Sequence, residues 1–307
     1  MLDVPGIALL EAIGGASNGT LKAGIFFGSR SSGVATNAAS AYDLMLVCDE
    51  PRLFYRAMKD AGFLTRSPAI LSVLDPFLAP TQVRLVGSGW LVKASVLSTS
   101  ALTRATSASR KDQFVAGRLF QDVHVVWSRD AAAATEVAAS IHSARAITLS
   151  WVGPDLPDEF DVAGYVRQLL RTSFRFEVRP ETGGRADALF LAQADRLVPL
   201  FTPILDQFAS EGRLIRKADG RFSRPADEAR RTHGRFFLQW SRVRATARWP
   251  KHAMTFDGWL DYIVRKAERH SGETIFLSPW ERRLPFLLLW PRLFRFLKHQ
   301  RSRSRPV

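Results

Sequence analysis

The stretches AGIFFGS (residues 23–29) and YDLMLVC (residues 42–48) decide the fold of this chain. The first is a short apolar run that ends at Gly28-Ser29, which predicts a strand entering a tight loop. The second has the length of a strand and is apolar on both faces, which is typical of a central strand in a sheet covered on both sides. We therefore expect an α/β domain that includes residues 22–127.

Turn residues and periodicity predict the neighbouring elements. A Gly-Ser-Gly turn between residues 83–86 and 90–96 predicts a hairpin. Further expected elements are a strand over 123–127 and helices over 130–146 and 160–171. In SFRFEVR (residues 173–179) apolar and charged residues alternate, which predicts a strand that places Glu177 and two arginines on one face.

The last third of the chain has a mostly helical pattern. Thr255 has the character of an N-cap, and Phe256 opens an apolar stripe that predicts a helix after it. Short apolar pairs on either side of Asp219-Gly220 predict a small hairpin, as in a winged-helix-like module. We expect three parts: residues 1–185, a mostly helical part over 186–275, and a basic, aromatic tail over 276–307.

The composition limits the class of protein. The 307 residues are 46% hydrophobic and 23% charged, values that argue against a disordered or fibrous protein. The lone cysteine, Cys48, excludes an intrachain disulfide and a multi-thiolate zinc site. Residues 1–20 have no basic n-region and are not Arg-rich, so we expect neither a signal peptide nor a transit peptide.

The net charge of +14 is unevenly placed along the chain. Residues 213–251 carry a net charge of +9 and residues 281–307 a net charge of +7, so the rest of the chain is close to neutral. Two cationic segments in the last third imply an anionic partner, such as nucleic acid, a phospholipid surface or a polyphosphate.

The pattern that points to chemistry is the Gly-Ser turn followed by Asp43 at the start of the second apolar strand. Small turn residues let backbone N–H groups and the Ser29 hydroxyl approach a triphosphate. A carboxylate at a strand edge can hold Mg²⁺, as in nucleotidyl transfer. The Asp-x-Asp pair common in such enzymes has Ala41 at its first position here. On spacing alone, a turn before an ordinary strand with a capping aspartate explains the pattern as well.

Four segments occur in the order of the motifs of a known enzyme family. They are IFFGSRSSGV…AYDLMLVCDEP (25–51), KASVLST (93–99), VAGRL (115–119) and SFRFEVR (173–179). They resemble the Gly-Ser-Gly-Val turn with its Asp-led strand, the Lys-Tyr-Gly-Val-Ile-Ser strand, the Ala-Gly-Arg-Leu motif and the Ser-Tyr-x-Gly-Asp-x-Arg motif of mitochondrial-type phosphatidate cytidylyltransferases (CDP-diacylglycerol synthases). The resemblance covers about residues 24–180. It implies a nucleotidyltransferase-like domain of the α/β (α+β) class over residues 1–185.

The resemblance also implies a set of site residues. The triphosphate of CTP would be cradled by Gly28 and Ser29. The catalytic carboxylates and Mg²⁺ ligands would be Asp43 and Glu177, with Asp49 as a third acid. The cations expected to offset phosphate charge are Lys93, Arg118 and Arg179. Departures from the family pattern include Glu177 in place of Asp and Phe176 in place of Gly.

The implied reaction joins CTP and phosphatidic acid to give CDP-diacylglycerol and pyrophosphate. The basic, aromatic tail fits an interfacial anchor on an anionic membrane. We therefore expect a cytoplasmic protein, peripheral on a bacterial inner membrane, with nucleic acid the less favoured partner. One alternative is a nucleotidyltransferase of the same fold that uses another acceptor. The other is a catalytically inactive basic protein that binds RNA or membranes.

Overall fold

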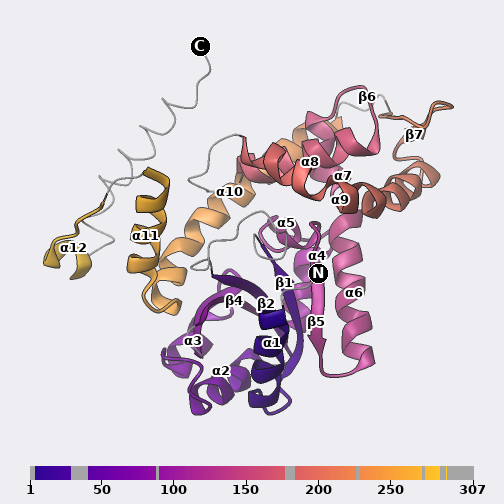
Figure 1. Cartoon of the computed structure of the whole chain (residues 1–307). Coiled ribbons are helices and arrows are strands. Elements are labelled where there is room, and N and C mark those ends of the chain that lie inside the picture. Colours follow the sequence, from indigo (N-terminus) through magenta and orange to yellow (C-terminus); the bar gives the residue numbers. More distant parts are fainter. Residues whose placement is uncertain are drawn as a thin grey trace.

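A mixed five-stranded sheet forms the centre of the first half of the chain (Figure 1). The structure is a computed structural model that describes residues 4–28, 41–87, 90–176, 184–225, 229–271, 274–283 and 288. The strands are β1 (Leu21–Phe27), β2 (Tyr42–Cys48), β3 (Thr81–Gly87), β4 (Trp90–Ser98) and β5 (His124–Ser128). Their order is β3-β4-β2-β1-β5, and β2 and β4 form the parallel pair in it. The α/β class and the predicted hairpin are thus confirmed.

Strand β2 lies at the middle of the sheet because both of its faces are apolar. Leu44, Leu46 and Cys48 point into one hydrophobic cluster, whereas Met45 and Val47 point into another. Helices cover both faces, so the sheet is the middle of three layers. One face packs against α1 (Val4–Ala16), α2 (Pro51–Asp60) and α3 (Pro68–Leu74); the other packs against α4 (Thr99–Thr106), α5 (Ala116–Leu119) and α6 (Ala131–Ala146).

A third hydrophobic cluster, mostly from residues 149–238, lies beside the sheet. Its elements are α7 (Leu149–Val152), the 3₁₀ turn η1 (Gly153–Asp155), α8 (Val162–Phe176), α9 (Arg185–Ser210) and a small sheet of β6 (Glu159–Phe160), β8 (Phe222–Ser223) and β7 (Ile215–Arg216). The strands β7 and β8 form the hairpin predicted around Asp219-Gly220. Helices α8 and α9 pack against each other in this cluster, on either side of the boundary expected near residue 185.

The strand predicted over residues 173–179 is wrong where the structure describes it. Residues 173–176 form the last turn of α8. The helical period set by Tyr165, Val166 and Leu169 continues through the buried Ser173, and this packing outweighs the short alternation of SFRF. Glu177 and Arg179, which the prediction places on one strand face, lie outside the described residues.

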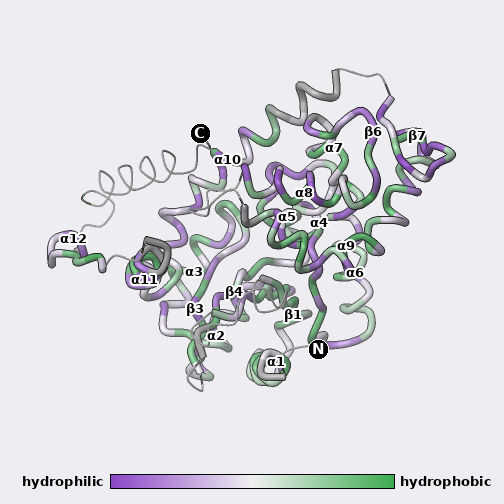
Figure 2. Tube along the Cα trace, turned by 45° about the horizontal axis from the view of Figure 1, so that its top comes forward, coloured by the Kyte–Doolittle hydropathy of each residue, from purple (hydrophilic) through white to green (hydrophobic). Residues whose placement is uncertain are grey.

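Helix α10 (Ala229–Thr255) connects the third cluster with the sheet half of the chain. Leu238 belongs to the third cluster, and further along the helix Ser241, Arg244 and Arg248 contact the sheet half of the chain. Figure 2 shows both hydrophilic and hydrophobic residues along α10. Two more helices follow, α11 (Trp259–Ser271) and α12 (Pro279–Arg283). Thr255 is the last residue of α10 rather than the N-cap of α11, because the helical backbone continues through it from the preceding turn.

Among the described residues, one helical segment, Ala186–Ser210 of α9, is long and apolar enough to cross a membrane by length and composition. Its Leu197, Phe201 and Leu205 are fully buried in the third cluster.

Candidate functional site at the end of strand β2

The first part of the site is the close approach of Asp43 to Gly28. Phe27, the last residue of β1, pairs with Asp43 of β2, so Gly28 begins its turn directly beside the carboxylate. Gly28 has a φ of +87°, and a Cβ placed on it would lie 2.6 Å from Oδ2 of Asp43. Only glycine adopts this conformation readily and leaves this space. The local sequence therefore places an acidic group directly against the backbone of Gly28.

Two basic residues continue the row that Asp43 begins. Asp43 pairs with Lys93 of β4, and Lys93 pairs with Arg84 of β3. Directly paired residues on neighbouring strands project from the same face, and the strands are about 4.8 Å apart. The end of the sheet thus presents one carboxylate and two cations side by side, on the face covered by α4, α5 and α6.

Helices α5 and α10 bring further cations to this end of the sheet. The guanidinium groups of Arg118 and Arg248 lie over the ring of Phe114, at 3.9 Å and 4.5 Å from its centroid. The imidazole of His252 lies beside the same ring, with the two centroids 6.1 Å apart. Lys93, Arg118 and Arg248 are called the cation cluster below, and His252 lies beside them.

Asp112 holds α10 in place against the cation cluster. Its Oδ2 accepts hydrogen bonds from Nε of Arg244 and Nη2 of Arg248, both at 2.8 Å. Burial alone would raise the pKa of Asp112, but the charge of Arg248 and the two arginine hydrogen bonds hold that pKa below its usual value. The backbone N–H of Gln113 adds a 3.0 Å hydrogen bond to Oγ of Ser241. Asp112 is therefore a structural anion, already neutralised by α10.

His252 is the most unusual group beside the cation cluster. Burial, followed by the charges of Lys93, Arg248, Lys251 and Arg118, lowers its pKa to about 3. Neither ring nitrogen has a hydrogen-bond partner among the described residues, and the same holds for the buried Nη1 of Arg248. Buried polar atoms are nearly always paired in native proteins, to protein, water or a ligand. An anion rich in acceptor oxygens, such as a phosphate, matches both the charge and the unpaired donors.

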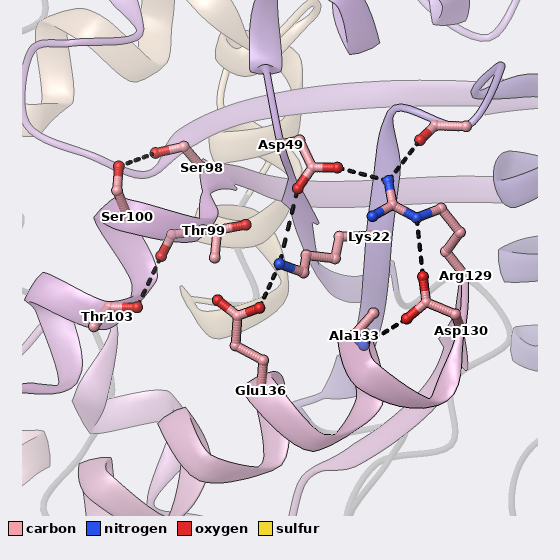
Figure 3. Close-up of polar contacts among 11 residues, drawn as sticks. Lys22, Asp49, Ser98, Thr99, Ser100, Thr103, Arg129, Asp130, Ala133 and Glu136 are labelled. Atoms are coloured by element: carbon pink, nitrogen blue, oxygen red, sulfur yellow. Dashed lines mark hydrogen bonds and ion pairs between the residues drawn. The ribbon is translucent and has the colours of Figure 1, made fainter.

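Asp49 is not brought together with Asp43. The two residues stand at opposite ends of β2, which separates them by about 20 Å at the usual strand rise. Figure 3 shows Asp49 between two cations, with its carboxylate 2.6 Å from Nη1 of Arg129 and 3.8 Å from Nζ of Lys22. Asp49 thus ties β2 to β1 and β5 and cannot share a metal ion with Asp43.

The predicted site residues divide into three groups. The structure places Gly28, Asp43 and Lys93 at one end of the sheet, and the charges of Lys93 and Arg118 both act on His252. Asp49 lies at the other end. The remaining three, Ser29, Glu177 and Arg179, lie outside the described residues.

A metal ion at this site would have Asp43 as its protein ligand. Within the part of the chain that the structure describes, no group of three or more His, Cys, Asp or Glu side chains could hold an ion. Mg²⁺ is commonly bound by one or two carboxylates together with substrate phosphates and water, so a single carboxylate beside phosphate-binding cations fits it. Asp43 therefore suits Mg²⁺ that arrives with a nucleotide.

The sequence does not reveal the contribution of α10. Arg248 and Lys251 lie in the cationic segment 213–251, yet both are buried. Nζ of Lys251 donates a 2.6 Å hydrogen bond to the carbonyl oxygen of Phe77, and burial lowers the pKa of Lys251 to about 8. The charge pattern indicates an anionic partner, but only the packing of α10 shows which basic side chains are buried.

Comparison of the sequence with the profiles of protein families, and with curated proteins, gave no match.

Proposed function

We propose that the protein is a phosphatidate cytidylyltransferase. The observation that carries the proposal is the carboxylate of Asp43, resting against the positive-φ turn at Gly28 with the cation cluster at the same end of the sheet. A carboxylate for a divalent ion next to several phosphate-binding cations is what transfer of a nucleotidyl group requires. The motifs that resemble the cytidylyltransferase family supply the identity of the substrates.

We assign a role in substrate binding to each residue of the site. The backbone at Gly28 approaches the triphosphate of CTP, because no side chain intervenes. Lys93, Arg118 and Arg248 offset its negative charge and that of the pyrophosphate leaving group. His252, neutral at physiological pH, donates a hydrogen bond to a phosphate oxygen without adding a further charge to the crowded cluster.

The chemistry is a displacement at the α-phosphorus of CTP. A phosphate oxygen of phosphatidic acid forms the new bond to the α-phosphorus, and the bond to the β-phosphate breaks to release pyrophosphate. Mg²⁺ held by Asp43 would neutralise phosphate charge as the reaction proceeds. Positioning and charge neutralisation account for most of the rate enhancement in such transfers.

The lipid substrate requires contact with a membrane. We propose that the basic C-terminal region brings the protein to an anionic surface on the cytoplasmic side, where phosphatidic acid is presented. Each basic residue near such a surface contributes about 1 kcal/mol.

The experiment is an assay with purified protein, labelled CTP, Mg²⁺ and phosphatidic acid. Asp43→Asn should lower the formation of CDP-diacylglycerol by about 100-fold or more, the loss typical of removing one electrostatic group from an active site. Asp49→Asn is the matched control on the same strand and should retain turnover, because its carboxylate serves Arg129 and Lys22. Full activity of Asp43→Asn would overturn the proposal.

A second candidate is a catalytically inactive binding protein. It is favoured by the single carboxylate that the described residues bring to the end of the sheet. Binding of CTP without turnover, under conditions in which Mg²⁺ and phosphatidic acid are saturating, would support this candidate. Turnover with another phosphorylated acceptor, and none with phosphatidic acid, would instead support a nucleotidyltransferase with a different substrate.

A further inference from the structure

Arg84 of β3 is a cation whose guanidinium makes no ion pair or hydrogen bond with any described residue. Its Nε is buried and unpaired within this part of the chain, although buried polar atoms in native proteins nearly always have a partner. The side chain as a whole is partly exposed, so a ligand from solvent can reach it. Arg84 is therefore a cation at which an anion can bind.

The register of the sheet places Arg84 directly beside another cation. Arg84 pairs with Lys93 of β4, and Lys93 pairs on its other side with Asp43 of β2. Like charges that face each other across two strands destabilise a sheet. Lys93 has the carboxylate of Asp43 as a neighbour, whereas Arg84 lies on the last strand of the sheet. An anion bound at Arg84 would offset this repulsion.

The turn between α10 and α11 shows where the guanidinium of Arg84 lies. A Cβ placed on Gly258 would lie 3.0 Å from Nη1 of Arg84, so the two residues are close neighbours. The carboxylate next to this turn is already engaged. Oδ2 of Asp257 accepts a 2.9 Å hydrogen bond from Oγ1 of Thr65, and its Oδ1 lies 3.7 Å from Nη2 of Arg66. The acidic group of the turn thus serves other partners than Arg84.

Arg84 stands apart from the cation cluster. The charges that act most strongly on His252 come from four other residues, namely Lys93, Arg248, Lys251 and Arg118. Two strand spacings of about 4.8 Å separate Arg84 from Asp43 along the row. A ligand group bound at Arg84 is thus a neighbour of the nucleotide site.

The order of the strands indicates which phosphate binds there. Gly28 follows β1 on one side of Asp43, and Arg84 lies on β3 on the other side. In the proposed reaction the attacking and leaving oxygens lie roughly in line across the reacting phosphorus. With the triphosphate of CTP at Gly28, the attacking phosphate therefore comes from the side of Arg84.

We propose that Arg84 binds the phosphomonoester group of the acceptor lipid, phosphatidic acid. The inference rests on the proposed function and assigns the acceptor its own cation. The planar guanidinium suits this group, because it can donate two parallel hydrogen bonds to phosphate oxygens. An additional contact to the triphosphate of CTP is the competing role of Arg84.

The kinetic test uses dihexanoyl phosphatidic acid, a short-chain acceptor that dissolves in water, so docking on a membrane does not enter. Arg84→Gln should raise the KM for this acceptor by about ten- to a hundredfold, the effect of losing a hydrogen bond to a charged group, and leave the KM for CTP unchanged. Arg84→Lys should recover part of the loss. Arg66→Gln is the matched control and should keep both KM values, because Arg66 faces Asp257.

A second readout, thermal unfolding without CTP, does not depend on turnover. Dihexanoyl phosphatidic acid should raise the Tm of the wild type, because a ligand that binds the folded chain stabilises it. Glycerol 3-phosphate carries the same phosphomonoester without acyl chains. A rise with both compounds assigns binding to the phosphomonoester alone, and a rise with the lipid alone adds a contribution of its chains. In either case the rise should disappear in Arg84→Gln. Without ligand this variant should unfold at the wild-type Tm or above it, because the repulsion with Lys93 is removed.

Two results would overturn the proposal. One is a KM for CTP that rises in Arg84→Gln while the KM for the acceptor stays constant. The other is a rise in Tm with dihexanoyl phosphatidic acid that is equal in Arg84→Gln and the wild type. A wild type that forms no CDP-diacylglycerol would contradict the proposed function instead, and the Tm measurement would still decide whether Arg84 binds a phosphomonoester.

Discussion

Gly28 occupies a position that no other residue fills without displacing the carboxylate beside it. Its φ of +87° is unfavourable for side chains, and a Cβ would lie 2.6 Å from Oδ2 and 3.2 Å from Cγ of Asp43. The absence of a side chain at residue 28 thus leaves the room that the Asp43 carboxylate occupies.

We expect Gly28→Ala to lower turnover by about tenfold or more, because the added methyl group pushes the Asp43 carboxylate from its place. Gly62→Ala is the matched control, since Gly62 has a φ of +78° but a Cβ on it would meet nothing within 4 Å. In both variants an alanine must adopt a left-handed backbone conformation, which costs about 1–2 kcal/mol. The difference in kcat/KM between the two variants therefore isolates the contact with Asp43. Equal losses in the two variants would contradict the assignment.

His252 makes the stability of the protein depend on pH. Its pKa of about 3 in the folded chain lies below the ordinary histidine value of about 6.5. Below pH 6.5 the imidazole of His252 therefore binds a proton in the unfolded chain but not in the folded chain. The free energy of unfolding consequently falls as the pH falls toward 3.

His252→Gln removes this group and should flatten the pH dependence. Between pH 7 and pH 5 the wild type should lose about 2 kcal/mol more of its unfolding free energy than the variant does, measured by urea denaturation without nucleotide. Parallel curves for the two proteins would show that His252 is protonated in the folded state as readily as in the unfolded one.

Some residues of the site could be predicted from the sequence and others could not. The pairing of a Gly-Ser turn with Asp43 could be predicted because both lie in one short segment whose strands are adjacent. His252 and Phe114 gave no sequence signal, since a histidine in a helix and a phenylalanine near a turn are ordinary residues. Their role follows from the docking of α10, which brings residues far apart in the chain to one end of the sheet.

Helix α10 is held against the sheet by a buried ion pair rather than by apolar contacts alone. Asp112 and Arg248 are both nearly fully buried, with 8% and 2% of their side chains exposed. Removal of one partner from such a pair leaves a buried charge uncompensated, which costs far more than the loss of a surface pair.

Asp112→Asn should lower the free energy of unfolding at pH 7 by about 3–5 kcal/mol. Asp206→Asn is the control, because its partner Arg216 is exposed and the pair contributes at most about 1 kcal/mol. The pKa of Asp112 lies below its usual value, so its stabilisation is present above about pH 4 and is lost as the pH falls through the lowered pKa. The gap between the wild type and Asp112→Asn should therefore close in acid, as urea denaturation at successive pH values would measure.

At the scale of elements, long or strongly apolar segments were predicted well and short alternations were not. The strands β1, β2, β4 and β5 and the helix α6 follow from runs whose burial agrees with their local pattern. The end of α8 does not, because four alternating residues carry less information than the helical packing of the longer stretch before them.

At the scale of the whole molecule, the positive charge is divided between the interior and the surface. Part of it is internal, where Arg248 and Lys251 are buried against the sheet. Another part, such as Arg242, stays on the surface. The sequence predicts an anionic partner from the total charge, but a one-dimensional pattern cannot tell which basic side chains are buried.

The contact between Asp112 and Arg248 joins residues that are 136 positions apart in the chain. Closing so long a loop costs entropy, and contacts of this kind form late and slowly. A ribosome releases the strand that carries Asp43 well before it releases α10, and chains fold from the N-terminal side as they emerge. A growing chain can therefore display the acidic residue while the groups that complete the cation cluster are still unmade, and this end of the sheet is assembled only after α10 has emerged.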